Sequence, residues 1–334
     1  FDDAGWAEVA RLVASDRRLG DGFGLDVAID SPVAVISSRS GSTAYVFRRD
    51  GSSWSEEERI VAFAEPAQPA TLGSMAVSGD LVAVGSRVDP EGGSVRVYEE
   101  GPSGWTNVAT VRSPNDSDDD RFGEPVGIDW DALVVGAAAT PGGGAIWRFQ
   151  RSGDQWNATA LLEIAEGSEG DAFGASLEVM PSRVVGGAPG DDDSAGSAHL
   201  FDHTGTLWTL TDSFQVAGSE SDDGLGIDLD LFGDDVIVGA FRYDWGPTPD
   251  AGSALILCEP GVPVAAFRFQ PPVAVAGEPV EFQDLSEGTP DRWHWRFGDG
   301  GQSMDRDPVH AFGSPGSYTV TLTAGNDHGS HATS

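Results

Sequence analysis

The chain of 334 residues contains no lysine and a single cysteine, and both shortages narrow its possible functions. All 19 basic residues are arginines, against 54 acidic residues, so the formal net charge is −35. This charge argues against nucleic acid and anionic membrane surfaces as partners, because both would be repelled. It is compatible with calcium binding, with life in high salt, or with a solvated acidic surface. The lone Cys258 excludes an internal disulfide and lies in an apolar run that predicts a buried, unreactive thiol.

Long apolar runs and helical periodicity are missing as well. No run approaches the ~18 residues that a membrane helix needs, so we expect no membrane insertion in this segment. The 45 glycines and 20 prolines indicate many turns, and 39% apolar residues are enough for a packed core. Short runs rich in valine, isoleucine and aromatic residues between these turns predict an all-β protein.

Tryptophan marks an internal repeat. Trp6, Trp54, Trp105, Trp156 and Trp208 are separated by 48, 51, 51 and 52 residues, and each is followed by a Phe-Gly or Leu-Gly pair and two further apolar runs. Four short strands in each repeat of this length predict a propeller blade, so we expect a five-bladed β-propeller over residues 1–260. The N-terminal Trp6 run is expected to complete the fifth blade as its fourth strand, which would close the ring without an open sheet edge.

The repeat resembles the FG-GAP repeats of integrin α-subunits and bacterial surface proteins. The segment "VVGGAPGDDDSAGSAHLF", residues 184–201, carries this resemblance, which extends over about residues 1–258. It implies an extracellular propeller with ligand-binding loops. The chain departs from integrin-type rings, which have seven blades, and its loops lack the D-x-D-x-D-G calcium pattern.

Residues 261–334 differ in composition and resemble a PKD domain, an Ig-like β-sandwich. The resemblance rests on the W-x-F-G-D-G motif that begins at Trp295 and on the alternating run Tyr318, Val320 and Leu322. Trp295 and Phe297 point the same way from one strand and are expected to fill the core. We expect the chain to stop before the last strand of this sandwich and further domains to follow. The PKD domain would act as a spacer.

Acidic loops are the candidate metal sites. Calcium prefers six to eight oxygen ligands, which clustered carboxylates can supply. The alternative is that these carboxylates only solvate turns, and Asp21, Asp171 and Asp223, each two residues before a Phe or Leu, suggest a structural role. The candidate calcium ligands are Asp191, Asp192, Asp193, Asp118, Asp120, Asp222 and Asp223. We expect no other cofactor.

A second group of carboxylates is expected in the propeller tunnel. If the strand after each Phe-Gly pair is innermost, alternate residues face the tunnel, and in a closed ring Asp26, Glu178, Asp228 and Asp230 would converge. Paired carboxylates can cleave glycosidic bonds, but a tunnel filled with water or cations would also explain them.

Aromatic residues outside the repeat pattern are candidate ligand contacts. The segment "FRYDWGPTPD" offers Tyr243, Asp244 and Trp245 in a long loop, a composition typical of sugar-binding and protein-binding surfaces. Trp130 and Trp147 also lie outside the pattern but closer to strands, and capping of a blade edge would explain any of these aromatic residues.

The sequence therefore predicts a secreted or cell-surface, non-catalytic binding or adhesion protein whose loops contact a glycan or an extracellular protein. Two alternatives stay open: a structural subunit of an extracellular fibre or coat, and a glycoside hydrolase or lyase that uses the tunnel carboxylates. No nucleophile elbow, P-loop or H-E-x-x-H motif supports an enzyme.

Overall fold

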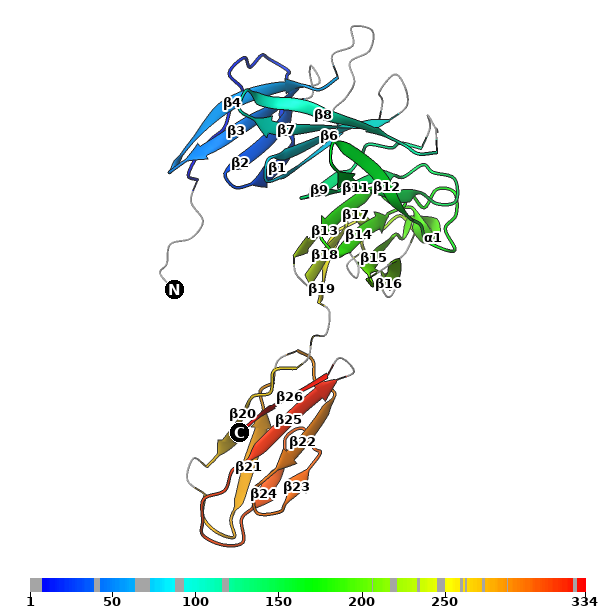
Figure 1. Cartoon of the computed structure of the whole chain (residues 1–334). Coiled ribbons are helices and arrows are strands. Elements are labelled where there is room, and N and C mark those ends of the chain that lie inside the picture. The colour runs from blue at the N-terminus through cyan, green and yellow to red at the C-terminus, as the bar shows by residue number, and fades with distance from the viewer. Residues whose placement is uncertain are drawn as a thin grey trace. The chain divides into compact units, whose positions relative to one another are not determined.

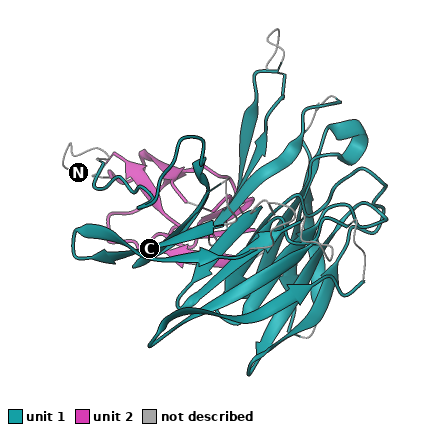
Figure 2. Ribbon diagram, turned by 90° about the horizontal axis from the view of Figure 1, so that it is seen from above, with its two compact units in different colours: residues 1–257 teal, residues 258–334 magenta. Residues whose placement is uncertain are grey.

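The computed structural model of the chain divides into two compact units, residues 1–257 and residues 258–334 (Figures 1 and 2). The structure describes residues 8–38, 43–63, 73–87, 93–115, 120–205, 207–216, 221–232, 235–244, 250–258, 261, 263–271, 274–286, 288–326 and 329–334. Among these residues no helix is long and apolar enough to cross a membrane.

The first unit consists of five antiparallel sheets, each built from strands that follow one another in the chain (Figure 1). Sheet one contains β1 (Phe23–Asp30), β2 (Val33–Ser38), β3 (Thr43–Asp50) and β4 (Ser53–Val61); sheet two contains β5 (Ser74–Ser78), β6 (Leu81–Ser86), β7 (Ser94–Gly101) and β8 (Gly104–Arg112); sheet three contains β9 (Val126–Asp129), β10 (Ala132–Ala137), β11 (Ala145–Ser152) and β12 (Gln155–Leu162); sheet four contains β13 (Ser176–Met180), β14 (Arg183–Ala188), β15 (Ser197–His203) and β16 (Trp208–Phe214); sheet five contains β17 (Leu225–Phe232), β18 (Asp235–Ala240) and β19 (Ser253–Cys258). The first strands lie next to one another in the order β1, β5, β9, β13 and β17.

The second strand of each sheet explains how the sheets stack. In β2, Val33 and Val35 pack against sheet two, whereas Ala34 and Ile36 pack on the opposite face. Because both faces of such a strand are covered, it is an almost continuous apolar run, whereas the outer strands β4, β12 and β16 are largely exposed.

Consecutive sheets also approach through their backbones at glycines. The fifth residue of β6 is Gly85, and a Cβ atom built on it would lie 2.0 Å from the carbonyl oxygen of Gly123, in the Phe-Gly pair of sheet three. The same contact joins Gly187 of β14 to Gly226 of sheet five, again at 2.0 Å. Since real Cβ atoms do not approach a carbonyl this closely, only glycine allows these sheets to pack at this spacing.

The N-terminal run does not take its predicted place. Residues 8–22 contain no strand, and Leu12 and Ala14 pack instead on the outer face of sheet one, where Ala14 is 2% exposed. The prediction that this run is the fourth strand of sheet five is therefore wrong for its described residues. The physical reason is apolar burial, because Ala34, Ile36 and Phe47 on sheet one would otherwise lack a cover.

The second unit contains two antiparallel sheets. One sheet contains β20 (Phe267–Gln270), β21 (Pro279–Asp284) and β24 (Val309–Ala311), and the other contains β22 (Arg292–Arg296), β23 (Gln302–Ser303), β25 (Thr321–Asn326) and β26 (Gly329–Thr333). Trp295 and Phe297 are fully buried and, as predicted, belong to the core together with Phe282. The indole nitrogen of Trp295 donates to the carbonyl oxygen of Asp305 at 3.0 Å.

Candidate functional site

The first strands of sheets one and two are linked through Asp26. Its Oδ2 accepts a hydrogen bond from the amide of Met75 at 2.6 Å, and its Oδ1 accepts one from the amide of Val27 at 2.9 Å. Burial raises the pKa of Asp26, the two amide bonds oppose this, and the nearby charge of Glu124 raises the pKa further. Asp26 therefore acts as a bridge between sheets, and its carboxylate neighbour is Glu124 of sheet three.

Glu178 and Asp230 are the two predicted tunnel carboxylates that the structure brings together. Burial is the main cause of the raised pKa of Glu178, and the charge of Asp230 adds to it. Asp228 and Asp230 each accept the amide of the following residue, Leu229 and Leu231, at 3.1 and 2.8 Å. A carboxyl group whose pKa is raised, next to a second carboxylate, has the general form of an acid–base pair.

Replacing Glu178 with glutamine should stabilise the protein at neutral pH. A raised pKa means that the folded chain holds this proton more tightly than the unfolded chain, so the carboxyl stabilises the fold at low pH and that contribution is lost as the pH rises through the folded pKa. We expect Glu178→Gln to exceed the wild type in urea unfolding at about pH 7, with the difference shrinking towards about pH 4. A difference that does not depend on pH would contradict this account.

An exposed tryptophan occupies the turn between β9 and β10. Trp130 is 75% exposed and has a φ of 52°, in the left-handed region that bulky residues rarely adopt. The matching two-residue turn of sheet two has Gly79 at this position, with a φ of 57°. Both turns are fixed by the preceding sheet, since Asp30 accepts the amide of Gly79 at 2.7 Å and Ser78 accepts the amide of Trp130 at 3.1 Å.

Carboxylates surround this turn. Burial raises the pKa of Asp129, and the charges of Asp131 and Asp30 raise it further, so these three carboxylates lie near one another. We call Trp130 together with Asp30, Asp129 and Asp131 the tryptophan turn. An apolar ring face beside hydrogen-bond acceptors is suited to binding a sugar ring. The signals available in the sequence were a tryptophan outside the repeat pattern and the two aspartates that flank it.

The loop predicted to bind ligand has its described residues, Tyr243 and Asp244, engaged in contacts within the fold. The side chain of Tyr243 packs against the core between sheets four and five, and its carbonyl oxygen accepts the amide of Gly252 at 3.0 Å. Asp244 accepts the amide of Asp250 at 2.7 Å. Trp245 lies outside the described residues. Tyr243 therefore supports the fold, and its ring is not a free platform.

The predicted calcium ligands are largely engaged in turns. The carboxylate of Asp120 accepts hydrogen bonds from Ser113 at 2.5 Å and from the amide of Phe122 at 2.9 Å. Asp223 is buried, and its carbonyl oxygen accepts the amide of Arg242 at 3.2 Å. Asp222 has a φ of 78° in the same turn, and Asp118 lies outside the described residues.

The three aspartates of the "GDDDSAG" loop lie in the left-handed turn α1 (Asp191–Ser194). Asp191 accepts from the Ser197 hydroxyl at 2.6 Å, and Asp192 accepts from the amide nitrogen of Gln215 at 2.8 Å. In the part of the chain that the structure describes, no three His, Cys, Asp or Glu side chains are grouped to hold a metal ion.

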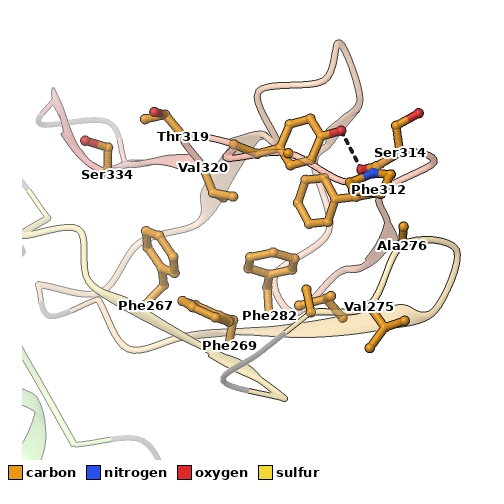
Figure 3. A pocket seen from close by; sticks show the side chains of 15 residues that line it. Phe267, Phe269, Val275, Ala276, Phe282, Phe312, Ser314, Thr319, Val320 and Ser334 are labelled. Atoms are coloured by element: carbon orange, nitrogen blue, oxygen red, sulfur yellow. Dashed lines mark hydrogen bonds between the residues drawn. The ribbon is translucent and has the colours of Figure 1, made fainter.

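The second unit has an apolar cleft of about 500 Å³ where its two sheets separate (Figure 3). Phe267, Phe269 and Phe282 line one side, and Val320 lies across from them. The hydroxyl of Tyr318 donates to the carbonyl oxygen of Ser314 at 2.8 Å at the rim. The cleft offers aromatic and aliphatic side chains together with the polar side chains of Ser314, Thr319 and Ser334.

Comparisons with family models give one match in each unit of the chain. A family model for the FG-GAP repeat matches residues 6–47, and one for the PKD domain matches residues 262–334. No curated protein matches. The crystal structure of the computationally designed Ika4 protein is similar over 58% of this chain and 94% of that chain, with 13% sequence identity and a TM-score of 0.38. The chain thus carries an FG-GAP repeat and, after it, a PKD domain, two domain types that are typical of extracellular adhesion or binding proteins.

Proposed function

We propose that this chain is a secreted or cell-surface, non-catalytic binding protein that holds a glycan at the tryptophan turn. In this proposal the five sheets pack on one another like propeller blades without closing a ring on themselves, and the PKD domain is a spacer. The observation that carries the proposal is the exposed indole of Trp130 beside Asp129 and Asp131. The ring would stack on the apolar face of a pyranose, and the carboxylates would accept hydrogen bonds from its hydroxyl groups.

The backbone at Trp130 supports a functional role for the ring. A bulky residue held at positive φ costs of order 1–3 kcal/mol, and such strain is commonly found at ligand sites. Glycine would remove the strain at this position, as Gly79 does in sheet two. The exposed ring gains little from burial in the fold, so its contribution is expected to lie in contact with a ligand.

A glycan array tests this proposal with the whole chain and two variants. Trp130→Ala should lose selective binding, by roughly tenfold or more in affinity. Trp130→Gly should also lose binding while its free energy of unfolding stays equal to or above that of the wild type, because the strain is relieved. The exposed Leu207, changed to alanine, is a control that should bind normally. Unchanged glycan binding by Trp130→Ala would contradict the proposal.

Calcium can be tested on the same array. Because the carboxylates of Asp120, Asp191 and Asp192 accept hydrogen bonds from other side chains, we expect binding to persist in chelator. Loss of binding in chelator, restored by calcium, would instead place the ion at the acidic loops, including Asp118.

A second candidate function is hydrolysis of a glycosidic bond. Glu178, whose pKa is raised by burial, and its neighbour Asp230 have the general form of an acid and a carboxylate partner. FG-GAP and PKD domains are in general non-catalytic, which favours binding over this alternative. Release of reducing ends from a polysaccharide panel, abolished by Glu178→Gln, would establish the enzyme instead.

A further inference from the structure

The fifth sheet has the glycine by which sheets two, three and four each receive the following sheet. Gly239 is the fifth residue of β18, the position that Gly85, Gly136 and Gly187 hold in β6, β10 and β14. A Cβ atom on those three glycines would lie 2.0–2.3 Å from a carbonyl oxygen of the following sheet. On Gly239 it would meet nothing nearer than 3.6 Å, and that nearest atom belongs to Asp228 of the same sheet.

The first sheet has the other half of this contact, a Phe-Gly pair of the kind that meets the glycine of a preceding sheet. Gly24 has a φ of 89°, close to the values of 104°, 87° and 87° at Gly123, Gly174 and Gly226, whose carbonyl oxygens contact the preceding sheet. Phe23, in the same pair, is only half-buried, whereas Phe122 and Phe173 are fully buried between sheets. Sheet one thus presents a Phe-Gly pair that no sheet of its own chain covers fully.

Apolar side chains are exposed on both of these faces. On sheet one, Val27 and Ile29 are 65% and 68% exposed, on the face away from sheet two. On sheet five, Ile237 and Ile256 are 43% and 70% exposed, on the face away from sheet four. Elsewhere in the unit the corresponding faces are buried against a neighbouring sheet.

A polar contact that sheet one makes with sheet two has half of its counterpart in sheet five. Asp26 accepts the amide of its own neighbour Val27 and an amide of the next sheet, that of Met75. Asp228 holds the same position in sheet five and accepts the amide of its own neighbour Leu229. The second bond has no counterpart among the hydrogen bonds of the described residues. A sheet placed here would supply it.

We infer that the outer face of sheet five receives the outer face of sheet one from a second copy of this chain. The two faces are different surfaces of one molecule, so the contact is head to tail and repeats from copy to copy. The interface is the one already used three times inside the chain at Gly85, Gly136 and Gly187. A second copy is the occupant because the two faces carry the two halves of that interface: the fifth-position glycine and free space on sheet five, and the Phe-Gly pair with exposed Val27 and Ile29 on β1 of sheet one.

The N-terminal run fits this arrangement. Inside the chain, each fourth strand leads directly into the first strand of the next sheet, as β4 precedes β5. Residues 8–22 lead in the same way into β1, so in the joint they would lie next to the open edge of β19 in the other copy. The edge of β19, which has no partner strand among the described residues, would then be covered by the N-terminal run of the partner copy.

Charge sets the condition under which association is expected. Each copy carries a formal charge of −35, so copies repel one another at low ionic strength. The screening length falls from about 10 Å at 0.1 M salt to about 3 Å at 1 M, while apolar contacts persist. Association should therefore strengthen as salt is raised.

Sedimentation velocity on the whole chain tests this inference over a range of protein and salt concentrations. We expect the wild type to form oligomers whose size grows with both. Val27→Asp blocks one face and Ile237→Asp blocks the other, so each variant alone should be monomeric, with association weakened by roughly tenfold or more. Mixed in equal amounts, the two variants should form a 1:1 dimer that grows no further, because each supplies the face that the other lacks.

Two controls distinguish loss of this interface from misfolding and from nonspecific association. Gly239→Ala adds a single methyl group where the chain itself leaves space, so it should unfold like the wild type yet fail to associate. Val309→Asp changes an equally exposed residue of the second unit and should associate normally. A wild type that stays monomeric at every concentration and salt would overturn the inference and favour closure of the chain on itself. So would a variant mixture that remains monomeric.

Discussion

Replacing Gly187 with alanine is expected to destabilise the first unit by about 3 kcal/mol, the upper end of the usual range for overpacking. The new Cβ would lie 2.0 Å from the carbonyl oxygen of Gly226 and 2.3 Å from the hydroxyl oxygen of Ser176. The hydroxyl of Ser176 also donates to that carbonyl at 2.7 Å, so the substitution would disturb a hydrogen bond between sheets four and five. Since the closest neighbour is backbone, a side-chain rotation cannot relieve the clash.

Urea unfolding followed by tryptophan fluorescence measures this effect, and Gly239→Ala is the matched control. Gly239 has the same place in sheet five but has free space around it, so its alanine variant should lie within about 0.5 kcal/mol of the wild type. Equal losses from both substitutions would mean that general strand propensity, and not the contact between sheets, controls stability at these glycines.

Replacing Trp295 with alanine should unfold the second unit selectively. Trp295 is 0% exposed and lies 5.2 Å from Phe267 and 5.5 Å from Phe282, measured between ring centroids. Removing so large a buried ring costs about 3–5 kcal/mol, and the hydrogen bond from its indole nitrogen to Asp305 is lost as well. In a sandwich of this size that loss is a large part of the total stability.

Calorimetry should therefore show a lower or absent transition for the second unit, while the transition of the first unit stays in place. Trp293→Ala is a useful comparison on the same strand, because Trp293 is only partly buried and should cost less. If both transitions shifted together, the two units would not unfold independently.

The sequence was most informative where a pattern recurs. The Phe-Gly and tryptophan spacing predicted sheets of four short strands, and the W-x-F-G-D-G motif predicted the buried pair Trp295 and Phe297. A repeated pattern is a reliable signal because every sheet packs against its neighbours in the same way. The same residue type therefore occurs at the same position of several repeats.

Single positions were harder to predict. The N-terminal run carries the strand pattern of the other Trp runs, but its residues Leu12 and Ala14 pack against sheet one. Tyr243 and Trp130 both lie outside the repeat, and only the structure distinguishes a ring packed in the core from one in solvent. Such differences depend on contacts between residues far apart in the chain, which composition and spacing do not contain.

The pairing of every strand in the first unit with its sequence neighbour has a consequence for how the chain folds. Each described strand of sheets one to five pairs with the strand before or after it in the chain, so the strand pairings close short loops, which favours rapid folding. A chain of this kind can begin to fold in any sheet and extend to the next, as in linear repeat proteins. During synthesis, sheet one could form as soon as β4 leaves the ribosome, well before β17 has been translated.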